Sequence, residues 1–126
     1  KRVHRLRKMV GGGMRQIGFL AAAGIYALDH HIERLEEDHR KAKRLAHGLA
    51  EIKNIKINPT EVETNILYFD VSPAEKTAQE VVLACRQKGV LLHATAKTRI
   101  RCVTHLDVSF ADIDHALQVI GEVMRG

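Results

Sequence analysis

Two short stretches of this sequence carry residues that could bind an anion. VGGGMRQ, at residues 10–16, follows a basic run and includes Arg15. Glycine backbone can approach a bound group closely, so this turn is either a flexible joint or an anion site. TRIRCVTHLD, at residues 98–107, places Arg99 and Arg101 on one face of a predicted strand. One of these arginines could grip a carboxylate with two parallel hydrogen bonds, but strand-face arginines are usually only solvated, and periodicity does not choose between them.

Other reactive residue types give weaker signals. His30 and His31 diverge on a helix, and no His-Glu-x-x-His or paired Cys-x-x-Cys spacing occurs, so no metal site is expected. Cys85 and Cys102 fall on core-facing positions without a neighbouring base and are expected in the core. No Gly-x-Ser-x-Gly occurs, and GGGMRQ lacks the Lys-Ser/Thr pair of a phosphate-binding Walker loop.

Length and composition indicate one domain-sized piece of globular protein. The chain has 126 residues, of which 45% are hydrophobic and 28% charged, and no apolar run approaches the ~20 residues of a membrane span. Two thiols and no signal-peptide pattern favour a reducing, cytoplasmic location. The net charge of +5 is local, because residues 1–16 hold six basic residues and no acid, while the rest holds 14 basic and 15 acidic residues.

The first 30 residues predict two helices. Residues 1–9 continue a helix that the glycines end, and a second helix runs from about residue 14 to 29. The second helix is apolar on nearly every side, so it is expected to be buried, with Gly18 and Gly24 allowing another backbone to approach closely.

The remaining residues predict alternating helices and strands. In chain order we expect a helix at about 31–52, a strand at 64–71, a helix at 74–89, strands at 90–95 and 99–108, and a final helix capped by Ser109. The residues expected to face the core include Ile32, Leu35, Ala42, Leu45, Leu49, Val81, Cys85, Ile100, Cys102, Leu106, Ile113, Ile120 and Met124. This order predicts an α/β fold, with a small, mostly antiparallel sheet and helices on one face.

Four segments carry a resemblance that covers the whole chain, from Lys1 to Gly126. RKMVGGGMRQIGFLAAAGIYAL, ERLEEDHRKAKRLAHGL, TNILYFDV and RCVTHLDV occur in that order. Together they resemble the C-terminal third of low-specificity L-threonine aldolases, pyridoxal-phosphate lyases of the aspartate aminotransferase structural class (fold type I). The resemblance implies that residues 1–30 end the cofactor-binding large domain and that residues 31–126 form the small C-terminal α/β domain.

The family reaction cleaves L-threonine or L-allo-threonine to glycine and acetaldehyde, and pyridoxal phosphate accepts the electrons of the broken bond. In the family, the lysine that carries the cofactor lies in an SKG-type segment upstream of the glycine turn. No lysine of this sequence stands in such a context. The resemblance therefore implies that this chain holds no catalytic residue, is inactive alone, and depends on the remaining N-terminal part of the enzyme to bind the cofactor.

The resemblance assigns three residues to a site. Arg101 matches the family arginine that holds the substrate α-carboxylate. Lys8 and Arg15 match basic residues beside the glycine turn that approach the cofactor and active site across subunits of a homo-oligomer, a tetramer in the intact family enzyme. Cys102 stands where the family often has leucine, a difference that leaves Arg101 unaffected.

Two alternative functions remain open from the sequence. One is a related pyridoxal-phosphate lyase, either a β-eliminating enzyme acting on aromatic amino acids or a serine hydroxymethyltransferase-like enzyme. The other is a nucleic-acid-binding module that uses KRVHRLRK as a phosphate-contacting helix. Aromatic residues make up only 4% of the chain, and the sequence beyond residue 16 is net acidic, so nucleic acid is not an expected partner. The lack of a long apolar run likewise means that no membrane is expected as a partner.

Overall fold

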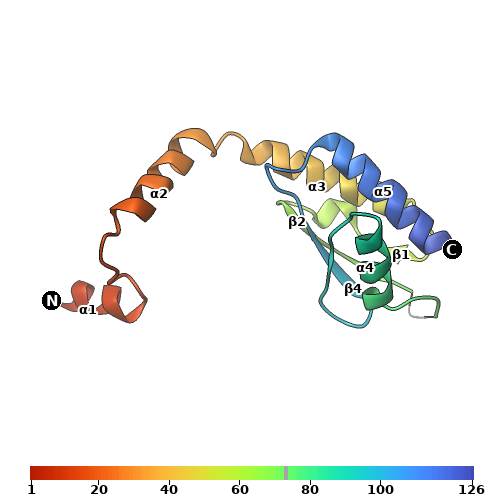
Figure 1. Cartoon of the computed structure of the whole chain (residues 1–126), viewed down its shortest axis with the longest axis horizontal. Helices are drawn as coiled ribbons and strands as arrows, with labels where there is room; N and C mark the ends of the chain where they lie inside the picture. Colours follow the sequence, from red (N-terminus) through yellow and green to blue (C-terminus); the bar gives the residue numbers. More distant parts are fainter. Residues whose placement is uncertain (73) are drawn as a thin grey trace. The chain divides into compact units, whose positions relative to one another are not determined.

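In the computed structural model, which describes residues 1–72 and 74–126, the chain divides into two units (Figure 1). One unit comprises Lys1–Glu33 and the other Arg34–Gly126. The assignment of residues 1–30 to the end of a larger domain stays a prediction. Within the described residues, none of the helices combines the length and apolarity that crossing a bilayer requires.

The first unit consists of α1 (Arg2–Met9) and α2 (Gly18–His30), separated by the glycine turn. No residue of either helix is buried, and Phe19 is 84% exposed. The expected burial of the second helix is therefore wrong within this unit, because residues 1–33 supply no second layer to cover it. Open space also lies beside Gly18 and Gly24. The helix begins later than expected because Gln16 has a positive φ of 50°, which helical backbone excludes.

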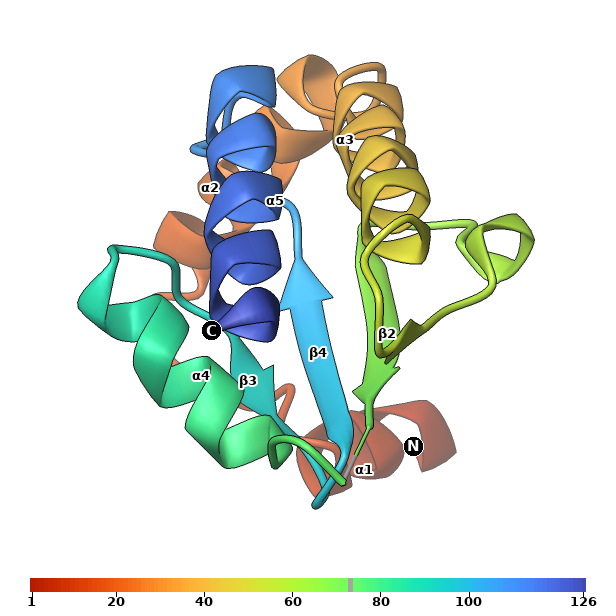
Figure 2. The ribbon, with the colours of Figure 1, turned by 90° about the vertical axis from the view of Figure 1, so that its right-hand side faces the viewer.

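The second unit has a four-stranded antiparallel sheet with the strand order β1-β2-β4-β3. Three helices, α3, α4 and α5, lie on one side of this sheet (Figure 2). The elements are α3 (Leu35–Ala50), β1 (Ile55–Lys56), η1 (Pro59–Glu61), β2 (Ile66–Val71), α4 (Ala78–Gln87), β3 (His93–Ala94), β4 (Arg99–Val103) and α5 (Phe110–Arg125). The predicted fold class is confirmed.

The core lies between the helices and the sheet. Alternation places Leu67 and Phe69 of β2, and Ile100 and Cys102 of β4, on the helix-covered face, where all four are buried. Cys85 of α4 is buried in the same core, so the expected placement of both cysteines is confirmed.

The ends of the two later helices follow local sequence signals. Ser109 and Asp112 form a capping box at the start of α5, as expected for the Ser109 cap, and Thr77 and Glu80 form another at the start of α4. Gly89 follows the end of α4 with a φ of +84°, which confirms it as the predicted helix stop. These signals are local, so the sequence alone suffices to find them.

Several elements are shorter than their sequence patterns suggest. The helix expected from residue 31 begins at Leu35, and both Ile32 and Leu35 are exposed. The strand expected at 90–95 is reduced to His93–Ala94. Strand β4 ends at Val103, so the inward placement expected for Leu106 is wrong, and its side chain is 42% exposed.

Candidate functional site

The alternation along β4 turns Arg99 and Arg101 toward the face of the sheet that the helices leave open. The register places Arg101 opposite Tyr68 of β2 on one side and His93 of β3 on the other. Directly opposed residues of antiparallel strands lie on the same face, with Cβ atoms about 5 Å apart. A row of Tyr68, Arg101 and His93 therefore crosses this open face.

Arg99 is already paired with an acid of the same face. Its Nη2 donates to Oδ2 of Asp70 at 2.8 Å, and its Nε donates to the same oxygen at 3.3 Å. The hydroxyl of Thr98 donates to the other carboxylate oxygen at 3.2 Å. The hydrogen bond from Arg99 lowers the pKa of Asp70 and outweighs the opposing effect of burial. Asp70 is therefore ionised at neutral pH, and the Arg99 charge is compensated within the chain.

Arg101 has no such partner among the described residues. Its side chain makes no ion pair there, and its Nε is buried without a hydrogen-bond acceptor. A buried donor left unsatisfied costs about 1–3 kcal/mol, and the Arg101 guanidinium lacks the carboxylate partner that Arg99 has in Asp70. A carboxylate offers two acceptor oxygens in the plane that a guanidinium matches. The structure thus separates the two arginines that periodicity left equivalent.

Tyr68 and His93 are neighbours of Arg101 that the sequence analysis did not single out. Tyr68 sits in NILYFDV between the buried Leu67 and Phe69, so alternation alone could have placed it on the open face. No comparable signal was available for His93, because its strand has only two residues. Its position next to Arg101 depends on the pairing of β3 with β4.

The glycine turn ends α1 in a Schellman arrangement. The Gly12 amide donates to the Arg7 carbonyl at 2.7 Å, and the Gly11 amide donates to the Lys8 carbonyl at 3.3 Å. Gly11 has a φ of +88°, and a Cβ on Gly12 would stand 2.6 Å from the Arg7 side chain and 2.9 Å from its carbonyl oxygen. Two of the three glycines are therefore required by the helix end itself.

Lys8 and Arg15 flank this turn and both are exposed. They belong to the unit Lys1–Glu33, whereas Arg101 belongs to the unit Arg34–Gly126. Their part in an active site stays a prediction.

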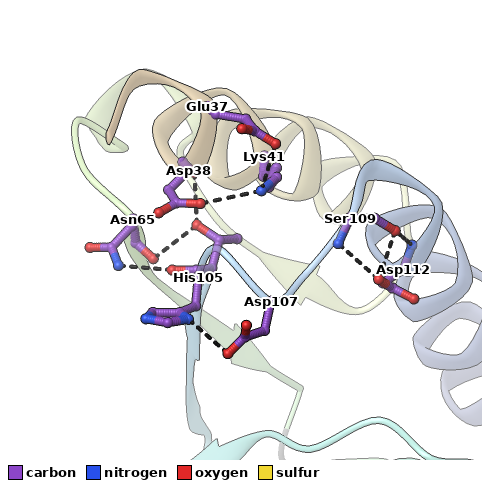
Figure 3. A network of polar contacts seen from close by, with 9 residues as sticks. Glu37, Asp38, Lys41, Asn65, His105, Asp107, Ser109 and Asp112 are labelled. Atoms are coloured by element: carbon purple, nitrogen blue, oxygen red, sulfur yellow. Dashed lines mark hydrogen bonds and ion pairs between the residues drawn. The ribbon is translucent and has the colours of Figure 1, made fainter. Parts of the chain in front are cut away.

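Lys41 is the one buried lysine among the described residues, at 1% exposure. Its Nζ lies 3.0 Å from Oε1 of Glu37 and 3.3 Å from Oδ1 of Asp38 (Figure 3). Burial by itself lowers the pKa of Lys41, but the hydrogen bonds with Glu37 and Asp38 outweigh it and raise that pKa. The amine therefore stays protonated and is a poor nucleophile.

The cysteines offer no reactive thiolate either. Burial raises the pKa of Cys85 to about 11 and that of Cys102 to about 12. Both thiols therefore stay protonated at neutral pH and act as core residues. Within the described residues, no group of three or more His, Cys, Asp or Glu side chains is placed to hold a metal ion.

Comparison with known proteins connects this geometry to a family. The family described as Beta-eliminating lyase matches residues 1–72. The chain is 38% identical over 120 residues to low-specificity L-threonine aldolase 1 of Arabidopsis thaliana, covering 94% of this chain and 34% of that protein. It is 44% identical over 109 residues to the low specificity L-threonine aldolase of Escherichia coli strain K12, covering 86% of this chain and 31% of that protein. The chain spans about a third of the length of these curated relatives.

Solved structures show the same fold at low sequence identity. The structure of MppP soaked with the product 2-ketoarginine matches with a TM-score of 0.60 at 15% identity, covering 79% of this chain and 30% of that one. An ornithine aminotransferase from Plasmodium yoelii matches with a TM-score of 0.58 at 13% identity, covering 74% of this chain and 26% of that one. These likenesses support the fold type I assignment.

Proposed function

The chain belongs to the beta-eliminating lyase family, and from this premise we propose that it is the C-terminal portion of a pyridoxal-phosphate-dependent threonine aldolase. The proposed reaction cleaves L-threonine or L-allo-threonine to glycine and acetaldehyde. The identity to threonine aldolases from a plant and a bacterium supports this reaction. The observation that carries the proposal is that Arg101, on the open face of the sheet, has a buried Nε without a hydrogen-bond partner among the described residues.

In this proposal Arg101 binds the substrate α-carboxylate. Its guanidinium can hold the two carboxylate oxygens with parallel N–H···O bonds, which fixes both the position and the plane of the group. That orientation matters because the Cα–Cβ bond must stand perpendicular to the cofactor ring for the ring to take up its electrons. Arg99 is less suited to this role because its Nε and Nη2 already donate to Asp70, whose carboxylate compensates its charge.

Pyridoxal phosphate supplies the electron sink when bound. Lys8 and Arg15 fit its anionic phosphate by charge and exposure. No described lysine fits covalent attachment to it, because the buried Lys41 is held by two carboxylates and Lys76 donates to the Val123 carbonyl, while the other lysines are exposed. We therefore propose that the cofactor-bearing lysine lies in the rest of the enzyme and that this chain is inactive alone.

The enzyme is further proposed to be a homo-oligomer in which Lys8 and Arg15 approach the active site of a neighbouring subunit. The exposed apolar side chains of α2 support an assembly of this kind, since a helix apolar on nearly every side is normally covered. Examples are Phe19, Leu20 and Ile25, each more than half exposed.

The test is an assay of the longer protein that carries this chain, purified with pyridoxal phosphate. It should release acetaldehyde and glycine from L-threonine, and should not release the aromatic leaving group from L-tyrosine or L-tryptophan. The reverse preference would identify the related β-eliminating lyase instead. Residues 1–126 alone, incubated with the cofactor and reduced with borohydride, should show no stoichiometric label on a single lysine.

A further inference from the structure

The chain just beyond Arg101 is fixed by a buried hydroxyl. Thr104 is only 1% exposed, and its Oγ1 donates to the main-chain carbonyl of Asp38 in the first turn of α3 at 2.7 Å. Alternation turns Thr104 toward the helices while Arg101 faces the other way. This one hydrogen bond therefore ties the end of β4 to α3 through the core.

Asn65, which directly precedes β2, forms two further hydrogen bonds with the main chain of Thr104. Its Nδ2 donates to the Thr104 carbonyl at 2.8 Å, and the Thr104 amide donates to the Asn65 carbonyl at 2.9 Å. The pairing of β2 with β4, which ends at Ile66 and Val103, is thereby extended by one further step. The side chain and the main chain of Asn65 together fix Thr104 at the end of the β2–β4 pairing.

The first turn of α3 is made rigid at the point where Thr104 binds it. Lys41 extends back along the helix to Glu37 and Asp38, with its ammonium buried between the two carboxylates. Burying a charge is costly unless it is well paired, and here the pairing holds together the turn whose carbonyl accepts the Thr104 hydroxyl. The Asp38 carbonyl, which accepts the hydrogen bond from Thr104, is therefore held in place by the helix turn.

Arg101 is the last residue of β4 that pairs with β3 among the described residues. Strand β3 pairs with β4 only at Ile100 and Arg101 within the described chain. Beyond Arg101, the main chain of β4 pairs only with β2, and the Thr104 hydroxyl then joins its end to α3. Without the Thr104 contacts, the strand could fray back to the arginine.

We propose that Thr104, clamped by Asn65 and by the Asp38 carbonyl, is a positioning residue for Arg101. Its hydroxyl fixes the end of β4, and this holds the guanidinium in the orientation that receives a carboxylate. This inference rests on the proposed function of Arg101. Thr104 itself does not touch the substrate.

The experiment uses the full chain of 126 residues, isotope-labelled for NMR, with acetate as the carboxylate probe. The Nε–H resonance of Arg101 is assigned by its loss in Arg101→Lys. Two readouts are followed: the acetate-induced shift of this resonance, and hydrogen exchange of the β4 amides without acetate. Thr104→Val removes the hydroxyl at nearly constant volume, Thr104→Ser retains it, and Thr77→Val removes a helix cap distant in sequence from β4.

Thr104→Val should weaken acetate binding about three- to tenfold and speed amide exchange from Arg101 to Val103 by a similar factor, because small displacements at a binding group cost affinity steeply. Thr104→Ser should restore both readouts. Thr77→Val should lower the melting temperature but leave both readouts at wild-type values. This contrast separates positioning from general destabilisation.

Wild-type values of both readouts in Thr104→Val, or equal losses in Thr77→Val, would overturn the positioning role. A wild-type chain whose Arg101 resonance ignores acetate would instead count against the proposed function. In that event amide exchange still decides whether Thr104 holds β4: faster exchange in Thr104→Val alone supports the clamp, and unchanged exchange refutes it.

Discussion

Arg99 and Asp70 lie opposite each other on β4 and β2, and two N–H groups of the guanidinium converge on one oxygen of the carboxylate. Two residues along the same strand face, Arg101 has a buried Nε without an acceptor among the described residues. The two arginines carry the same guanidinium group but differ in whether a carboxylate of the chain pairs with it. The charge of Arg99 is compensated by Asp70, whereas Arg101 has no ion-pair partner among the described residues.

The buried Lys41 should be important for stability, since its removal leaves Asp38 unpaired close to the core. Lys41→Met is expected to lower the free energy of unfolding by about 1–3 kcal/mol in urea denaturation. The exposed Lys43→Met, on the same helix, is the control and should change it little. Equal effects of the two substitutions would show that the ion pairs of Lys41 contribute nothing specific.

The same ion pairs predict a pH dependence. Hydrogen bonds with Glu37 and Asp38 raise the pKa of Lys41 against the opposing effect of burial. A raised folded-state pKa gives a contribution that is fully present below the unfolded value of about 10.4 and is lost as pH rises through the folded value. The stability difference between wild type and Lys41→Met should therefore be constant near neutrality and shrink only above pH ~10.4.

Gly11→Ala should unwind the end of α1. Its φ of +88° is strained for any residue with a Cβ, at a cost of roughly 1–2 kcal/mol. NMR Cα shifts of residues 2–9 should move toward coil values. Gly13→Ala is the matched control, because the nearest atom to its added Cβ, from the Lys8 side chain, lies at an ordinary 3.6 Å. Similar shifts in both variants would contradict the assigned role of Gly11.

The two core cysteines should resist alkylation. Burial raises the pKa of Cys85 to about 11 and that of Cys102 to about 12. At pH 8, iodoacetamide should modify the folded chain at least about a hundredfold more slowly than the urea-unfolded chain, whose thiols ionise near pH 8.5. The free energy of unfolding should also fall as pH rises above about 8.5, because the unfolded thiols lose their protons first. Rapid modification of the folded chain would contradict this.

Local patterns predicted much of the second unit. The alternation in RIRCV placed Ile100 and Cys102 in the core, and Ser109 and Gly89 marked helix ends, because each of these signals depends only on nearby residues. Apolarity predicted that α2 needs a covering layer, but it carries no information on which element supplies one. That is why its expected burial is wrong within this unit.

Long-range contacts set the details of the candidate site. Leu106 continues the apolar alternation of β4, yet the strand stops at Val103, and the next residue turns its hydroxyl to a carbonyl 66 positions earlier in the sequence. The pairing of Arg99 with Asp70 also spans two strands. Periodicity could show that Arg99 and Arg101 share a face, but only the fold shows that Arg99 pairs with Asp70 while Arg101 finds no ion-pair partner in the part of the chain that the structure describes.

Steady-state kinetics of Arg101→Lys and Arg99→Lys, in the proposed full-length enzyme, decide whether Arg101 holds the substrate carboxylate. Lysine keeps the positive charge but lacks the planar fork that makes two parallel hydrogen bonds. Disrupting a partly buried, hydrogen-bonded charge pair of this kind costs about 2–5 kcal/mol, so Arg101→Lys should lower kcat/KM for L-threonine by about 30-fold to a few thousand-fold, with an unchanged cofactor absorbance spectrum. Arg99→Lys keeps an exposed pair with Asp70 and should lose less than about fivefold. A severe loss in Arg99→Lys, or near-wild-type activity in Arg101→Lys, would contradict the assignment.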